Sequence, residues 1–331
     1  MNQILGFLPL PVAVFLGSFL LSAVMGMIMI PWLRKLKMGQ TVREDGLKSH
    51  YTKNGTPTMG GLIFLSSMVI IGIVLSFSGY QLLPYMLLTI GCGVVGFYDD
   101  WLKVVRKHNK GVSGKQKMIA LGFLSVLFIV WCVRSGTKMN YIAIPFVGIY
   151  DPWIIPVWLS GLFALFLLLA FTNGANLTDG VDGLAGSVSL VAFVAFGVIF
   201  SFQAENDEVR LFCALMAGSV LGYLLYNIHP AKVFMGDTGS LALGGAVTCI
   251  AIATGMPLFL IIICGIYAIE DLSVMIQVFW FKRTGKRVFL MAPIHHHFEM
   301  AGWKETKIVK MFTAVGVVLG LIAIAATRWW A

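Results

Sequence analysis

The stretch LLPYMLLTIGCGVVGFYDDWLKVVRK, residues 82–107, decides what kind of fold this chain can adopt. It begins with an apolar run over 82–98, continues with the adjacent acids Asp99 and Asp100, and ends among lysines and arginines. A helix needs about 20 residues to cross the hydrocarbon core of a bilayer, so this run is close to a full span. A carboxylate at a bilayer boundary is costly to desolvate unless it is hydrated, paired or bound to a cation. The stretch therefore predicts a membrane helix that brings two acids to a polar site.

The same pattern recurs along the chain, with Asp179 and Asp182 in NLTDGVDG and Asp237 in FMGDTGS. Hydrophobic residues make up 58% and charged residues only 12% of the 331 positions, which excludes an ordinary soluble domain. About ten runs are long enough to serve as spans, namely residues 11–33, 59–77, 82–98, 117–135, 154–173, 184–202, 209–228, 239–254, 258–280 and 307–327. We therefore expect an all-α integral membrane protein with about ten transmembrane helices, formed by one polytopic domain over residues 1–331.

The basic residues indicate the orientation. Most of the 24 lysines and arginines follow the first, third, seventh and ninth runs, so the positive-inside rule places these connections in the cytoplasm. Asp99, Asp100 and Asp237 lie at these connections, and Asp179 and Asp182 follow the fifth run on the same face, which predicts an active-site cleft on the cytoplasmic face and both termini outside. Residues 136–153, around Pro145 and Gly148, read as a small extracytoplasmic hairpin. The basic face suits anionic lipid headgroups or a phosphorylated substrate, and we expect no nucleic-acid partner.

Asp99 and Asp100 allow two interpretations. If the helix continues past them, Asp99 and Lys103 are i,i+4 neighbours and form an ordinary ion pair at the helix end. Alternatively, the two carboxylates work together, one as a base or nucleophile and the other as a metal ligand or electrostatic support.

The later acid motifs indicate a cation and an anion. Asn173, Asn176, Asp179 and Asp182 lie among glycines and offer hard oxygen ligands of the kind that Mg²⁺ prefers, although an ordinary Asn/Gly turn would share the pattern. Asp237 precedes an apolar run, where helix amides favour an anion and the acid could hold the accompanying metal; Thr238 or Ser240 could equally be a plain N-cap there. Phe234 could stack on a base or pack against lipid.

Three successive histidines, His295, His296 and His297, cannot all face one metal comfortably. We expect one or two of them to donate to a phosphate or sugar oxygen. Glu270 and Asp271 fall inside the ninth run and predict a helix that is broken or bent toward the same cavity. The chain has no GxxxxGK[ST] loop, so these sites together indicate phosphate handling beside a membrane without ATP.

The motifs KNGTPTMGG (53–61), GFYDDWLK (96–103), NLTDGVDGLAG (176–186), FMGDTGS (234–240) and APIHHHFE (292–299) occur in this order along nearly the whole chain. They resemble the phospho-N-acetylmuramoyl-pentapeptide-transferases, which belong to the polyprenyl-phosphate N-acetylhexosamine-1-phosphate transferase superfamily (glycosyltransferase 4 family). The resemblance implies transfer of phospho-MurNAc-pentapeptide from UDP-MurNAc-pentapeptide to undecaprenyl phosphate in the bacterial plasma membrane. The products would be lipid I and UMP, in the first membrane step of peptidoglycan synthesis. It also implies an Mg²⁺ cofactor and a homodimer.

The resemblance also assigns roles to residues. Asp237 matches the Mg²⁺ ligand, Asp99 the base or nucleophile, and Asp100 its acidic partner. Lys115 and Asn173 match polar groups of the catalytic cleft, and His296, with His295 and His297 beside it, would approach the sugar or diphosphate side. The uridine-side pocket would be formed by Lys53, Thr58, Asn176, Asp179, Asp182, Asn227 and Phe234, with Phe234 stacking on uracil.

Two other functions are compatible with parts of the sequence. A related transferase would use UDP-N-acetylglucosamine and polyprenyl phosphate, but the HHHFE run favours the muramoyl branch. A cation-coupled transporter would use Glu270 and Asp271 as coupling acids, and it predicts acids near the bilayer midplane in repeated halves. Here the acids gather at one face and no repeat is evident, which disfavours a transporter.

Overall fold

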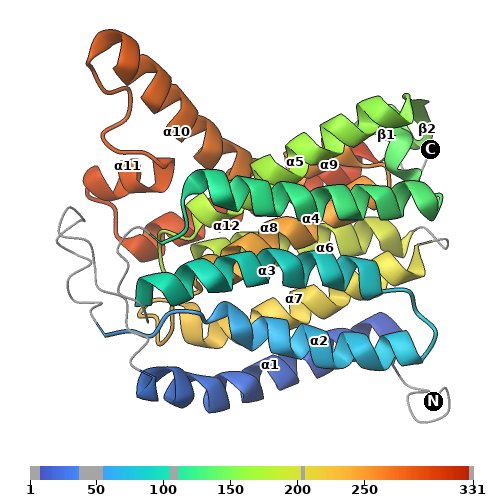
Figure 1. The fold of residues 1–331 in the computed structure, drawn as a ribbon, viewed down its shortest axis with the longest axis horizontal. Helices are drawn as coiled ribbons and strands as arrows, with labels where there is room; N and C mark the ends of the chain where they lie inside the picture. Colours follow the sequence, from blue (N-terminus) through green and yellow to red (C-terminus); the bar gives the residue numbers. More distant parts are fainter. Residues whose placement is uncertain (1–7, 37–54, 105–110, 203–205, 328–331) are drawn as a thin grey trace.

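The computed structural model describes residues 8–36, 55–104, 111–202 and 206–327, and within these ranges the fold is a bundle of helices (Figure 1). The longer helices are α1 (Leu10–Lys35), α2 (Gly61–Phe77), α3 (Leu83–Val104), α4 (Gly114–Arg134), α5 (Val157–Thr178), α6 (Leu184–Ser201), α7 (Asp207–Asn227), α8 (Gly236–Ala253), α10 (Gly265–Thr284) and α12 (Glu305–Ala326). Two short helices, α9 (Pro257–Ile263) and α11 (Ile294–Met300), flank α10.

Helix α8 is the centre of the bundle and is buried from Thr238 to Ala253. Small residues allow this burial, because they let the backbones of neighbouring helices approach closely. Gly96 of α3 lies against the carbonyl of Asp237, and Gly244 of α8 lies against the backbone of Phe171 and Thr172 in α5. A methyl group at either glycine would overlap the facing backbone. The close packing of α3, α8 and α5 brings the ends of these helices together.

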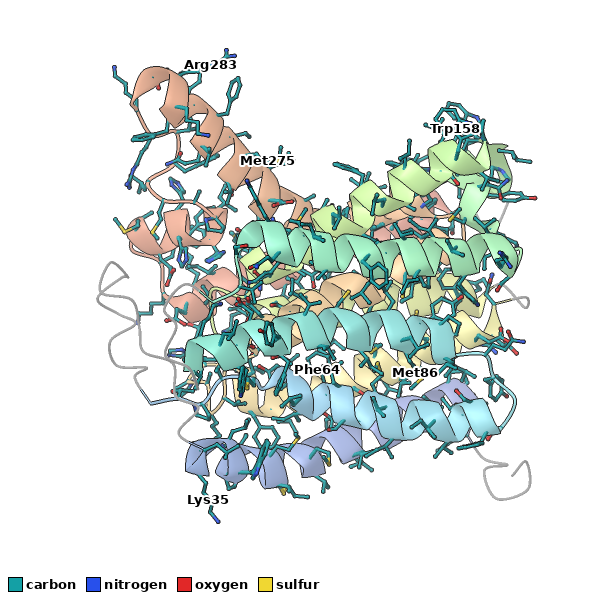
Figure 2. All side chains as sticks on the ribbon, viewed as in Figure 1. Lys35, Phe64, Met86, Trp158, Met275 and Arg283 are labelled. Carbon is teal, nitrogen blue, oxygen red and sulfur yellow. The ribbon has the colours of Figure 1, made fainter. Side chains whose placement is uncertain are left out.

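The outside of the bundle is apolar, as expected for a membrane protein. Exposed side chains include Leu20 and Met27 of α1, Phe123 of α4 and Leu321 of α12, whereas Phe64 of α2 points inward and packs edge-to-face on Tyr223 (Figure 2). Seven of the described helices are long and apolar enough to cross a membrane, or eight if α9 and α10 form one broken span. The polytopic membrane class is therefore supported, while the number of ten spans stays a prediction.

The predicted break in the ninth run is present. Helices α9 and α10 meet at Cys264 with a bend of 81°, and α10 leaves the bundle at an angle (Figure 1). Its projecting part carries Met275 on an exposed face and Arg283 near its end (Figure 2). Glu270 and Asp271 lie in the first part of this helix, which lies closest to the rest of the bundle.

A two-stranded antiparallel sheet lies at one end of the bundle, in the segment where the sequence predicts a hairpin. Strands β1 (Tyr141–Ile144) and β2 (Gly148–Ile154) follow the 3₁₀ helix η2 (Lys138–Asn140), and Tyr141 pairs with Ile154. The amide of Ala143 donates to the carbonyl of Gly255, just past α8, and the amide of Phe146 donates to the carbonyl of Ala326 at the end of α12. The end of α3, the start of α4, the end of α5 and the start of α8 lie at the opposite end (Figure 1).

Candidate functional site

Asp99 is held on both of its oxygens. It lies in the last turns of α3, where its side chain is fully buried. The amide of Val112, just before α4, donates to Oδ1 at 2.6 Å, while Lys103 forms an ion pair with Oδ2. The predicted i,i+4 contact between Asp99 and Lys103 is therefore confirmed. Burial of this acid is tolerable because the ammonium and the amide compensate its charge.

Asp237 lies opposite Asp99, in the first turn of α8. Its Oδ2 forms an ion pair with Lys117 of α4 and lies 3.4 Å from the ammonium of Lys103. Its Oδ1 accepts a 2.9 Å hydrogen bond from the side-chain amide of Asn176. Lys117 also lies 3.1 Å from Asp99 Oδ2. The two lysines thus bridge two acids that are far apart in the sequence, and the site draws on α3, α4, α5 and α8.

Asp100 makes different contacts from Asp99, its neighbour in the sequence. Its Oδ1 accepts the amide of Asp237 at 3.2 Å, and its Oδ2 accepts the amide of Thr238 at 3.0 Å and the hydroxyl of Thr238 at 2.7 Å. The first amides of a helix have no partner within the helix, and its N-terminus carries partial positive charge. Asp100 therefore caps α8 from another helix and fixes the backbone that carries Asp237.

Asp99, Asp100 and Asp237 each place one carboxylate oxygen within 4.8 Å of the others, close enough to share a cation. They are hard oxygen donors of the kind that Mg²⁺ prefers, and Mg²⁺ usually takes only one or two carboxylates from the protein. Asp100 already accepts three hydrogen bonds, whereas Asp99 and Asp237 face the two ammonium groups. The cluster has three acids and two lysines, so its chemistry fits a divalent cation together with an anion that draws the lysines away.

Asp179 and Asp182, the two acids of the turn after α5, have different neighbours. Burial and the nearby charges of Asp237, Asp100 and Asp182 raise the pKa of Asp179 well above its usual value, while an amide hydrogen bond from Gly236 opposes the shift. Asp182 turns instead toward His229, whose Nδ1 lies 3.1 Å from Oδ2, and it also accepts the amide of Ala231 at 3.1 Å. Only Asp179 therefore lies close to the Asp99–Asp237 cluster.

Asp182 belongs to a second group of possible metal ligands, in which its carboxylate, His229 and Glu305 place one ligand atom each within 4.8 Å of the others. Glu305 begins α12, and its Oε2 lies 3.5 Å from Nδ1 of His229. This group ties the start of α12 to the loops that follow α5 and α7.

Several of the residues that the family resemblance assigns to a uridine-side pocket lie around the loop before α8. Thr58 is buried, and Pro57 and Gly60 pair with the backbone of Phe234 through hydrogen bonds of 2.8 Å each. Asn227 accepts the amide of Gly183 at 3.1 Å and donates to the carbonyl of Val233 at 3.0 Å, so it joins the two loops that carry the acids. The structure thus brings together Thr58, Asn227 and Phe234, whereas Lys53 lies outside the described residues.

The three histidines have different polar partners, although the ring centroids of His295 and His296 lie only 4.1 Å apart. His295 is fully buried beside Glu270. Nδ1 of His296 lies 2.5 Å from Oε2 of Glu299, and Nδ1 of His297 accepts the amide of Leu290 at 3.1 Å. Asn173, also predicted in the cleft, donates to Asp271 of α10 at 2.6 Å.

The family resemblance points to Lys115, but the structure brings a different lysine into the site. Lys115 is exposed, and its ammonium forms no ion pair with any described residue, whereas Lys117 reaches both Asp99 and Asp237. The two positions differ by about 200° around a helix of 3.6 residues per turn, so only one of them can face the bundle. A second contact could not be read from the sequence: the hydroxyl of Ser240 accepts a 2.9 Å hydrogen bond from the side-chain amide of Asn176.

Comparison with known proteins adds a second line of observation. Residues 82–255 match the model of glycosyl transferase family 4, and residues 53–65 match phospho-N-acetylmuramoyl-pentapeptide-transferase signature 1. A phospho-N-acetylmuramoyl-pentapeptide-transferase of Acetivibrio thermocellus is 48% identical over 96% of this chain and 95% of its own length. Proteins of the same name from Shouchella clausii and Geobacillus thermodenitrificans are each 45% identical, over 96% and 94% of this chain and 97% and 96% of their own.

Proposed function

The chain belongs to the phospho-N-acetylmuramoyl-pentapeptide-transferases, and we propose that it transfers phospho-MurNAc-pentapeptide from UDP-MurNAc-pentapeptide to undecaprenyl phosphate. The products are lipid I and UMP. One observation supports this proposal at the level of residues. Lys103 and Lys117 bridge Asp99 and Asp237. An exchange of one phosphoanhydride for another requires groups that bind two phosphates and neutralise their negative charge. The lysines of this cluster, with a cation held by its acids, are groups of this kind.

The lysines have the central electrostatic role. In the structure their ammonium groups neutralise Asp99 and Asp237, and an incoming diphosphate offers them a stronger, doubly charged partner. When the lysines turn toward the phosphates, Asp99 is freed to orient or deprotonate the lipid phosphate. Positioned charges of this kind supply most of the acceleration in phosphoryl transfer, because little covalent chemistry is left to the protein.

Mg²⁺ is the cofactor that the acids fit. Asp237 would hold it, with Asp99 within reach, and the bound ion would supply charge neutralisation at the diphosphate. Asp100 would not compete for it, because its oxygens already hold the start of α8. The side chain of Asn176 keeps Asp237 oriented through Oδ1, which leaves Oδ2 as the oxygen that faces the lysines.

The geometry favours direct displacement over a phosphorylated Asp99. Asp99 is fully buried, and its Oδ1 still accepts the amide of Val112 after the lysines turn away, which favours a role as a base over attack on phosphorus. The lipid phosphate would instead attack the β-phosphorus in line and expel UMP. Incubation with the UDP substrate alone should give no phosphorylated protein by mass spectrometry, and trapping of such a species would favour the two-step route.

The uridine would lie near the loop before α8. Phe234 would stack on uracil, while Thr58, Asn176, Asp179, Asp182 and Asn227 would line the same side, with Lys53 joining them. His296 and His297, together with Asn173, would face the sugar and diphosphate, whereas the fully buried His295 would not reach them. The half-buried position of Phe234, beside the buried Thr58, supports this assignment.

The proposal includes an orientation and an assembly. The acid-bearing end would face the cytoplasm, since most lysines and arginines gather in its connections, and the β1–β2 sheet and both termini would lie outside. A homodimer is proposed on family grounds, and the molar mass of the purified protein in detergent, measured by light scattering, would test it.

The deciding experiment uses the purified chain in detergent with UDP-MurNAc-pentapeptide, undecaprenyl phosphate and Mg²⁺, scored for UMP release. UDP-N-acetylglucosamine in place of the muramoyl substrate tests the related transferase activity. UMP release with UDP-N-acetylglucosamine and none with the muramoyl substrate would overturn the proposal.

A further inference from the structure

Glu270 is a buried acid that the proposed chemistry does not use. It lies in the first half of α10 with no solvent exposure, and its Oε1 has no hydrogen-bond partner among the described residues. An isolated buried carboxylate is strongly unfavourable, so a chain that keeps one there needs a reason. Its neighbour in space is His295 of α11, which is also fully buried.

Glu270 holds His295 at two points. Its Oε1 lies 3.1 Å from Nδ1 of the ring, and its Oε2 accepts the backbone amide of His295 at 3.4 Å. Neither ring nitrogen of His295 completes a hydrogen bond with a described residue, so the contact between the ring and the carboxylate is one of close approach. The carboxylate thus fixes both the ring and the backbone of one residue.

The other side of the His295 ring lies against the acid-bearing turn. A methyl group at Gly180 would overlap Nε2 of His295, so the ring occupies the space beside this glycine. Gly180 lies between Asp179 and Asp182 in the turn that follows α5. Because His295 has no exposed surface, it cannot meet a substrate from solvent unless the turn moves first.

We propose that Glu270 is a positioning residue that acts through His295 to fix the turn of residues 179–183. The contacts run from α10 to α11 and then to the turn, so the bent helix and the acid cluster form one rigid unit. The expected effect on substrate binding rests on the proposed transferase function, whereas the order of the turn does not. His295 would therefore support the turn by packing against Gly180.

The test compares Glu270→Ala, Glu270→Gln and His295→Gln, with Ser273→Ala as the control. Ser273 is a buried residue one turn further along α10, and its hydroxyl donates to the carbonyl of Glu270 within the same helix. Hydrogen exchange of peptides covering residues 176–186 is measured on the full chain in detergent without substrate. KM and kcat for the UDP substrate are measured on the same preparations.

Glu270→Ala should speed exchange in the turn and raise KM about tenfold, by analogy with the loss of the carboxylate partner that orients a metal-ligating histidine. Its kcat should change by less than about threefold, because chemistry would be spared. Glu270→Gln keeps an acceptor for the amide and should be milder. The double variant Glu270→Ala/His295→Gln should be no worse than the worse single variant, since both changes interrupt one chain of contacts.

Unchanged exchange and KM in Glu270→Ala, or additive effects in the double variant, would overturn the proposal. A wild-type protein that released no UMP would refute the transferase proposal instead. Exchange in the turn would then still decide the role of Glu270 by itself.

Discussion

Lys117 and Lys115 provide the sharpest test of the site. Lys117→Met and Lys115→Met remove the same charge from the same helix, so any change in long-range electrostatics is shared. Of these two lysines, only Lys117 reaches Asp99 and Asp237, and its side chain is 20% exposed. Loss of one well-placed donor to developing charge costs about 3 kcal/mol, or about 100-fold in rate. We therefore expect kcat/KM to fall about 100-fold in Lys117→Met and to change less than about threefold in Lys115→Met.

The assay is UMP release at saturating undecaprenyl phosphate, with the UDP substrate varied. Lys117→Met could also weaken the fold, because it leaves two acids with only Lys103 between them. Thermal unfolding and elution profile in detergent are therefore measured for both variants. The reasoning fails if Lys115→Met loses activity while Lys117→Met retains it, or if both variants behave alike at equal stability.

Three further predictions concern the acids and their support. Removal of divalent cations by EDTA should abolish UMP release, and Mg²⁺ should restore it; undiminished turnover in EDTA would exclude the proposed cofactor. Asp237→Asn should lower kcat at least about 100-fold and weaken the dependence on Mg²⁺, measured as activity against Mg²⁺ concentration. Asp100→Ala should lower the free energy of unfolding by about 1–2 kcal/mol through the lost cap, seen as a lower midpoint in thermal unfolding. An unchanged midpoint would show that α8 does not need this cap.

Several features could be predicted from the sequence because their physical basis is local. Apolar runs of span length, the i,i+4 contact of Asp99 with Lys103, and the break within the run that carries Glu270 depend on residues near one another in the chain. The arrival of Asp99 and Asp237 at one end could also be inferred, since alternate connections of a polytopic protein share a face.

Other features depended on which helices pack together. Asp99 and Asp100 are adjacent, yet one meets two lysines and the other caps α8, because Gly96 lets α3 approach the start of α8 closely. The same holds for Asp179 and Asp182, which separate at the turn after α5. No local pattern distinguishes the members of either pair.

The amino-acid sequence by itself determined the membrane class, the helices and the residue types of the site, because hydropathy and helical spacing operate within a few turns. Only the tertiary structure decided that Lys117 rather than Lys115 enters the site and that His295 lies buried between Glu270 and Gly180. The physical reason is that the direction of a side chain follows from helix rotation and close packing. Both are set by contacts between residues that are distant in the chain.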